Sequence, residues 1–291
     1  MTRPRLPTRA NVRFALSALR GVRRGPVPVY DSLGADFFLS PARGWLNLGL
    51  WDGPGDEAEA AVAPRRLVET LARALPRGGA VLDAGNGLGA QDPVIASVAA
   101  PGRFVAINVT ESQLRAGRRR LDEAGAWPVL ADATRIPLAD GSVDGVISVE
   151  AAFHFRSRRE FFAEARRVLR PGGVLVMSDV SAERTIPRTP AELFAGLLNL
   201  RVWGLRARDQ WSRARIEAEL RDAGFVDVGV EVATDRVLRP ALRFLRARIA
   251  VRRDVPRACR TGARLVLWTW TVLWRGRAIE YLLVRASVPA G

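Results

Sequence analysis

The stretch that decides the fold is Val81-Leu-Asp-Ala-Gly-Asn-Gly-Leu-Gly-Ala90, an apolar run that leads directly into three alternating glycines. Residues Ala80 to Asp83 have the length and composition of a buried strand, and an amphipathic segment typical of a helix follows the glycines. Glycines at such a strand-to-helix turn let the backbone turn tightly and approach a ligand closely. The sequence therefore predicts a nucleotide cofactor at Gly85, Gly87 and Gly89.

The spacing of these glycines is G-x-G-x-G, which differs from the G-x-G-x-x-G fingerprint of dinucleotide-binding proteins. The pattern therefore disfavours NAD, with its pyrophosphate at the start of the helix. Glycine triplets also occur in ordinary turns, so the prediction depends on the elements around them.

Further strands and helices alternate along the chain. Short apolar runs stand at Phe104 to Ile107, Val129 to Ala131, Val143 to Val149 and Val174 to Ser178, with amphipathic segments between them. This alternation is typical of a parallel sheet covered by helices. Additional helices are predicted at Asp56 to Leu75, after Ser157, at Pro190 to Leu200, at Asp209 to Ala223 and over residues 236–275, and further strands at Phe225 to Val232 and Arg277 to Val288.

In combination, three segments resemble class I S-adenosylmethionine (SAM)-dependent methyltransferases. Gln113 after Ile107 to Thr110, and the stretch Gly44 to Trp51, resemble the subgroup that acts on small molecules. Val81 to Ala90 resembles motif I, residues 131–148 resemble the adenine-contacting segment and fourth strand, and Phe161 to Asp179 resembles the helix and fifth strand that follow. The resemblance implies a Rossmann-like α/β fold with a mostly parallel seven-stranded sheet and helices on both faces. It also implies SAM as cofactor and methyl transfer as the activity.

The resemblance suggests three regions. Residues 1–55 would hold a basic N-terminal helix and an aromatic lid, and residues 56–185 would form the SAM-binding core. Residues 186–291 would add acceptor-side helices, a basic helical insertion and the closing strands of the same sheet.

The same resemblance implies a set of cofactor contacts. Asp83, Gly85 and Gly87 would surround the methionine and ribose parts, while Asp132 and Ala133 would meet the adenine, unless Asp132 is only a turn residue. The second strand ends in Asn108 where the family usually has an acid for the ribose, and an amide can still donate and accept. The full expected set is Asp83, Gly85, Asn86, Gly87, Gly89, Asn108, Gln113, Asp132, Ala133 and Glu150. Tyr30 and Trp51 are lid candidates, with packing against the core as the alternative.

His154 is the single histidine of the chain, and it follows the fourth predicted strand at the edge where such sheets bind ligands. We expect it to be a general base for an oxygen acceptor, oriented by Asp179 at the end of the next strand. The alternative is a structural histidine. No metal is expected.

The charge is concentrated in two segments. The 45 basic residues are all arginine and give a net charge of +15, with seven arginines and no acid in residues 1–24, and ten arginines with one aspartate in residues 236–264. An amphipathic basic helix is predicted at residues 9–22. These segments suggest peripheral binding of a cytoplasmic protein to an anionic membrane surface. One cysteine excludes a disulfide within the chain.

The acceptor is the least constrained part of the function. Phe194, Trp203, Trp268, Trp270 and Trp274 suggest a small hydrophobic or lipid-like acceptor, although they are equally compatible with a core. We expect methylation on oxygen, with carbon and nitrogen as open alternatives. One alternative keeps the fold and the cofactor but not methyl transfer: a SAM-binding cyclase or scaffold. Another is an RNA methyltransferase, but the sequence has no motif for base methylation.

Overall fold

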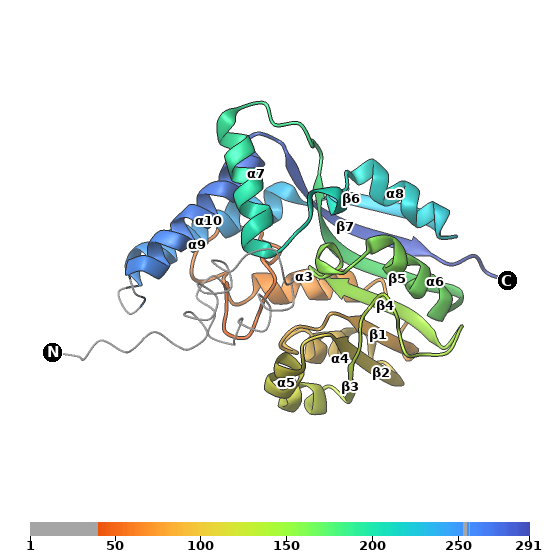
Figure 1. Ribbon diagram of the computed structural model, residues 1–291. Helices are drawn as coiled ribbons and strands as arrows, with labels where there is room; N and C mark the ends of the chain where they lie inside the picture. Colours follow the sequence, from red (N-terminus) through yellow and green to blue (C-terminus); the bar gives the residue numbers. More distant parts are fainter. Residues whose placement is uncertain (1–39, 253–254, 256) are drawn as a thin grey trace.

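The computed structural model describes residues 40–252, 255 and 257–291. The basic helix predicted at residues 9–22 and the lid candidate Tyr30 lie outside the described residues. Within them, a seven-stranded sheet forms the centre of the molecule, with helices on both of its faces (Figure 1).

The sheet has the order β3-β2-β1-β4-β5-β7-β6. Strands β1 to β5 are parallel, and β7 runs antiparallel between β5 and β6. The strands are β1 (Ala80–Ala84), β2 (Arg103–Asn108), β3 (Ala126–Leu130), β4 (Val143–Val149), β5 (Leu169–Ala182), β6 (Val226–Val232) and β7 (Ile279–Ser287). The predicted fold class and the neighbouring positions of β4 and β5 are confirmed.

Two apolar clusters cover the faces of the sheet. One contains buried residues of α3, α4, α5, α9 and α10, and the other contains those of α6 and α8. The helices are α3 (Ala63–Ala72), α4 (Asp92–Ala99), α5 (Glu111–Glu123), α6 (Arg158–Val168), α7 (Pro190–Trp203), α8 (Arg213–Asp222), α9 (Thr234–Val251) and α10 (Arg257–Arg275), with the 3-10 turns η2 (Ala152–His154) and η3 (Ala207–Asp209). Because both faces are covered, the parallel strands are almost continuously apolar.

Helix α6 shows how the local sequence determines where a helix begins and which face it buries. The Ser157 hydroxyl caps its first turn by accepting a hydrogen bond from the backbone N–H of Glu160. Phe161 and Phe162 then recur on the buried face, each with none of its surface exposed. The predicted helix at this position is confirmed.

Two predicted helices differ from the structure. The segment Asp56 to Leu75 is helical only over α3, where Pro64 occupies the first turn, a position that needs no backbone N–H donor. Residues 236–275 form two helices, because α9 ends at Val251 and α10 starts at Arg257. Helices α9, α10 and α7 lie together on one side of the sheet (Figure 1).

Candidate active site

The glycine loop joins β1 to α4, as predicted. Gly85, Gly87 and Gly89 have φ angles of 85°, 57° and 72°, which side chains rarely adopt. A Cβ on Gly85 would lie 2.6 Å from that of Ala151, and one on Gly87 would lie 3.3 Å from Leu46. The loop backbone therefore needs glycine both for its conformation and for the space around it.

Behind this loop lies a buried acidic pair. Both carboxylate oxygens of Asp83 accept hydrogen bonds from Gln91 Nε2, at 2.9 and 2.7 Å. Burial and the neighbouring Asp92 raise the pKa of Asp83 well above its usual value, and burial raises the pKa of Asp92 to about 7. Asp83 does not line the cavity above the loop, so it differs from the expected direct contact and holds the loop from behind.

Asn108, at the end of β2, is also committed to the loop. Its Nδ2 donates to the Gly87 carbonyl at 3.1 Å and to Gln113 Oε1 at 3.1 Å, and its Oδ1 accepts from the Thr110 backbone N–H at 2.9 Å. A carboxylate could not donate these first two bonds. The amide at this position therefore ties the end of β2 to the glycine loop while lining the cavity.

Asp132 stands where β3 leaves the sheet. Its Oδ1 accepts from both the backbone N–H and the hydroxyl of Thr134, each at 2.8 Å. These hydrogen bonds make Asp132 a turn residue, which was the alternative to an adenine contact. Among the described residues no donor reaches Oδ2, and Asp132 and Ala133 both line the cavity. The turn thus leaves one oxygen for a ligand.

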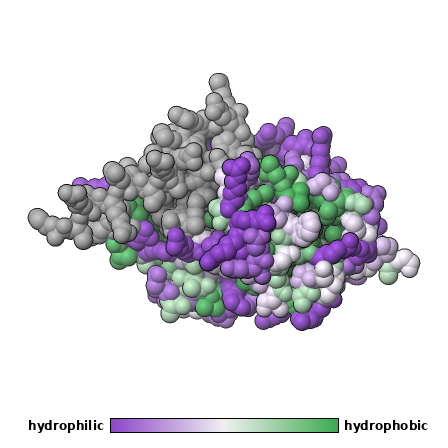
Figure 2. All heavy atoms as spheres, turned by 90° about the horizontal axis from the view of Figure 1, so that it is seen from below, coloured by the Kyte–Doolittle hydropathy of each residue, from purple (hydrophilic) through white to green (hydrophobic). Residues whose placement is uncertain are grey.

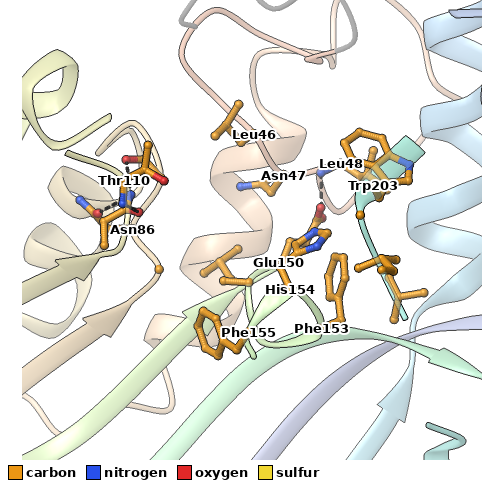
Figure 3. Close-up of a pocket in the computed structure, with 18 of the residues that line it drawn as sticks. Leu46, Asn47, Leu48, Asn86, Thr110, Glu150, Phe153, His154, Phe155 and Trp203 are labelled. Atoms are coloured by element: carbon orange, nitrogen blue, oxygen red, sulfur yellow. Dashed lines mark hydrogen bonds between the residues drawn. The ribbon is translucent and has the colours of Figure 1, made fainter. Parts of the chain in front are cut away.

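A single cavity of about 470 Å³ connects these groups to the helices beyond the sheet. Its volume falls within the range of small-molecule sites. Figure 3 shows Asn86 and Thr110 on one side of it and Trp203 of α7 on the other, with Glu150 and His154 between them. The far wall is formed by Asn199, Trp203, Leu238, Leu245, Val266 and Trp270, from α7, α9 and α10.

The expected catalytic pair is not formed. Asp179 accepts hydrogen bonds from Arg158 Nε at 2.8 Å and Nη2 at 3.1 Å, and from the Val180 backbone N–H at 2.7 Å. Asp179 is fully buried, and a buried carboxylate is stabilised far better by a guanidinium than by a neutral imidazole. The prediction that Asp179 orients His154 is therefore corrected: Asp179 is the partner of Arg158.

His154 does line the cavity, from the turn η2. Burial and the charge of Arg158 lower its pKa well below the usual value, so its imidazole is neutral at physiological pH. A base with this environment gains a proton at an energetic cost.

Glu150 follows β4 and has a φ of 50°, a left-handed conformation that is strained for a residue with a side chain. Its Oε1 accepts from the Leu48 backbone N–H at 2.8 Å and from the Tyr281 hydroxyl at 2.7 Å (Figure 3 shows the first). Burial raises the pKa of Glu150 to about 7, against the effect of these two donors.

The lid candidate Trp51 belongs to the core. It is 1% exposed, packs on Phe244 with ring centres 5.5 Å apart, and donates from Nε1 to the Leu48 carbonyl at 2.9 Å. It does not line the cavity, whereas Leu46, Asn47 and Leu48 do. The segment before Trp51 therefore reaches the cavity, through Leu46, Asn47 and Leu48 and not through Trp51.

Sequence reasoning missed Leu48, Arg158 and Tyr281. In the sequence, Leu48 and Tyr281 are 102 and 131 residues away from Glu150, to which they donate hydrogen bonds. Arg158 is 21 residues away from Asp179. Contacts between such distant positions leave no local periodicity or spacing. Glu150 itself, an acid directly after a buried strand, was in the expected set.

The comparisons with known proteins agree with this geometry. Residues 82–177 match a family described as a methyltransferase domain. Erythromycin 3''-O-methyltransferase of Saccharopolyspora erythraea is 32% identical over 224 residues, which make up 74% of this chain and 72% of that enzyme. The chain belongs to the class I SAM-dependent methyltransferases that act on small molecules, and it is an enzyme that uses SAM.

Solved structures share the fold at low identity. Geranyl diphosphate C-methyltransferase of Streptomyces coelicolor, in complex with S-adenosyl-L-homocysteine, has a TM-score of 0.65 and 16% identity, over 89% of this chain and 97% of that one. The [4+2]-cyclase SpnF has a TM-score of 0.64 and 20% identity, over 98% and 97%.

The site residues fit SAM. The glycine loop lies at one end of the cavity, where an added Cβ at Gly85 would clash with Ala151, and polar groups of Asn108 and Asp132 line the cavity there. The cofactor supplies an electrophilic methyl group on a sulfonium. Methyl transfer needs this group and the acceptor atom held in line within a dry cavity.

Proposed function

We propose that this enzyme transfers the methyl group of SAM to a hydroxyl oxygen of a small hydrophobic molecule. The observation that carries the proposal is the division of the cavity, with the glycine loop at one end and an apolar wall from α7, α9 and α10 at the other. The relative from Saccharopolyspora erythraea, an O-methyltransferase by name, supports oxygen as the acceptor atom. The alternatives of a cyclase, a scaffold or an RNA methyltransferase are not favoured.

The apolar wall supports a hydrophobic acceptor. Trp270 donates from Nε1 to Asn199 Oδ1 at 2.7 Å, which fixes the indole, and its ring lies 5.9 Å from that of Trp203. Both tryptophans line the cavity and are partly exposed. Fixed aromatic faces bind flat or branched apolar molecules without losing side-chain freedom.

The proposed cofactor contacts are Gly85, Asn86, Gly87, Asn108, Gln113, Asp132 and Ala133, which all line the cavity. Glu150 was also in the expected set and lines the same cavity, and a different role is proposed for it below. Asp83 and Gly89 support the loop, the first through Gln91 and the second through its approach to Gly117. The assignment of His154 as the base stays a prediction. The division into residues 1–55, 56–185 and 186–291 is likewise proposed, with 56–185 as the SAM-binding part.

We also propose that the protein binds anionic membrane surfaces as a peripheral protein. Residues 1–24 lie outside the described residues, but α9 and α10 expose Arg239, Arg243 and Arg264. An apolar stripe is also exposed on α7 and α10, where Phe194 and Trp268 are in contact with ring centres 6.0 Å apart. Seen from below, the described surface mixes hydrophilic and apolar groups (Figure 2). Within the described residues no helix is long and apolar enough to cross a membrane.

The transfer is tested with SAM labelled in its methyl group and a panel of hydrophobic phenols and alcohols. We expect labelled methyl ethers and S-adenosylhomocysteine in equal amounts. Asp132→Ala is expected to weaken SAM binding in calorimetry, with Asp140→Ala, an exposed aspartate outside the cavity, as the control. Label on carbon of panel members, or none at all, would overturn the oxygen assignment.

A further inference from the structure

We propose that Glu150 is the general base that takes the proton of the acceptor hydroxyl, and that Tyr281 and the Leu48 amide are its positioning partners. This inference rests on the proposed oxygen methylation and deepens it. It gives Glu150 a role in proton transfer in place of the cofactor contact implied by the family resemblance.

The first observation is that the Glu150 carboxylate is held through one of its two oxygens. Oε1 accepts two hydrogen bonds, one from the Leu48 N–H and one from the Tyr281 hydroxyl. Among the described residues none donates to Oε2, and this oxygen is open to the cavity that Glu150 lines. One oxygen is therefore fixed while the other faces the place of the acceptor.

The second observation is that both positioning partners are themselves immobile. Tyr281 is fully buried in β7, between β5 and β6. The carbonyl of Leu48 accepts from Nε1 of the buried Trp51, so the residue whose N–H contacts Glu150 is anchored to the core through its own carbonyl. Such a rigid environment holds the carboxylate in the orientation that proton transfer needs. Little conformational entropy is therefore lost during the reaction.

The third observation is backbone strain. Glu150 keeps a φ of 50°, and its N–H donates to Ser178 Oγ at 3.0 Å. Without this conformation the side chain would continue the alternation of β4. Strain of this kind is found where the surrounding structure fixes a side chain for function.

The charged and titratable groups on the packed elements agree with this role. Tyr281 on β7 stays protonated because burial raises its pKa well above the usual value. Asp179 on β5 is neutralised by Arg158 of α6, and His154 in η2 is neutral because its pKa is lowered. Burial raises the pKa of Glu150 to about 7, close to the pH at which a base must act.

The acceptor O–H bond breaks, and its proton moves to Oε2 of Glu150. A lone pair of the acceptor oxygen forms the new bond to the methyl carbon, and the electrons of the carbon–sulfur bond remain on sulfur. The products are a methyl ether, neutral S-adenosylhomocysteine and a protonated Glu150, which releases its proton to water.

The test compares wild type with Glu150→Gln on two probes, 4-nitrophenol, which is largely ionised at neutral to alkaline pH, and 4-butylphenol, which is not. Glutamine keeps an oxygen for the Leu48 and Tyr281 donors but cannot take a proton. We expect turnover of 4-butylphenol to fall by about 10²- to 10⁴-fold. We expect turnover of 4-nitrophenol and the Kd of SAM to change little. Glu123→Gln at the exposed end of α5 is the matched control.

Two further readouts separate a base from a structural link. Tyr281→Phe removes a donor that lowers the pKa of Glu150, so the rise of activity with pH is expected to shift to higher pH. Carbon NMR of labelled glutamate carboxyls, with Glu150→Gln for assignment, is expected to show Glu150 titrating near 7. This titration needs no acceptor, so it tests the site even if neither phenol is methylated.

Several outcomes overturn the inference. Equal losses on both phenols, or a weakened Kd for SAM in Glu150→Gln, would show a cofactor contact. A carboxyl that titrates in the ordinary range of glutamate would remove the basis for proton transfer near neutral pH. Failure of wild type to methylate any oxygen acceptor, with a Glu150 titration near 7, would contradict the proposed function and not the perturbed carboxyl.

Discussion

Arg158 and Asp179 form an ion pair whose side chains are 3% and 0% exposed. Removing one partner of such a pair leaves a charge without compensation in the interior. We expect Arg158→Ala to lower the free energy of unfolding by about 3–5 kcal/mol. Chemical denaturation with tryptophan fluorescence measures this value.

A double variant serves as the control for that prediction. Arg158→Met with Asp179→Leu removes both charges and fills much of the volume, so a large part of the stability should return. If the single variant lost less than about 1 kcal/mol, the magnitude of an exposed pair, then water would reach the pair and the assigned burial would be wrong.

His154 and Glu150 predict different pH profiles, because a base acts only when it is unprotonated. Burial and Arg158 lower the pKa of His154, so its contribution would appear as a rise in activity well below pH 6.5. The raised pKa of Glu150 places the rise near pH 7. We expect His154→Ala to keep the rise near 7 and Glu150→Gln to lose it. The opposite result would restore His154 as the base.

The glycine loop between β1 and α4 allows a direct test of whether a side chain is tolerated at position 85. Ala at position 85 would need a φ of 85° and would place its Cβ 2.6 Å from that of Ala151. The loop or the turn that carries Ala151 must then shift, and both line the cavity. We expect Gly85→Ala to weaken SAM binding in calorimetry by roughly tenfold or more, since about 1.4 kcal/mol corresponds to a factor of ten.

Gly125 provides a matched control, because it also has a positive φ, of 64°, but nothing lies within 4 Å of its added Cβ. Gly125→Ala should cost stability through the backbone alone and leave SAM affinity unchanged. Equal SAM affinity in both variants would mean that the loop tolerates a side chain at Gly85.

Elements whose pattern is local could be predicted from the sequence, and contacts between distant elements could not. Strand β4 was predicted over Val143 to Val149, as found, because both of its faces are buried and the run is continuous. The break between α9 and α10 was missed, since residues on both sides keep a helical, basic pattern. The family resemblance implied that Glu150 lies at the site, but its partners Leu48 and Tyr281 could not be predicted because they come from distant segments.

The whole molecule combines a net charge of +15 with an exposed apolar stripe on α7 and α10. Arginines beside exposed Phe and Trp are suited to the interface of an anionic bilayer. Such a position would bring the wall of the cavity formed by α7 and α10 close to an apolar phase, from which a hydrophobic acceptor could enter. The proposed membrane binding and the proposed acceptor class are therefore compatible with each other.

This arrangement predicts that vesicles with anionic lipid recover the protein by flotation, whereas neutral vesicles recover little and salt releases it. Each arginine near an anionic surface contributes about 1 kcal/mol, so the triple variant Arg239→Ala/Arg243→Ala/Arg264→Ala should weaken binding by roughly a hundredfold. The control is Arg115→Ala/Arg118→Ala/Arg119→Ala on α5, which has the same loss of charge, and whose ion pairs are exposed and contribute little to stability. If both triple variants lost binding equally, net charge alone would attract the protein to the vesicle, and the α9–α10 side would have no special role.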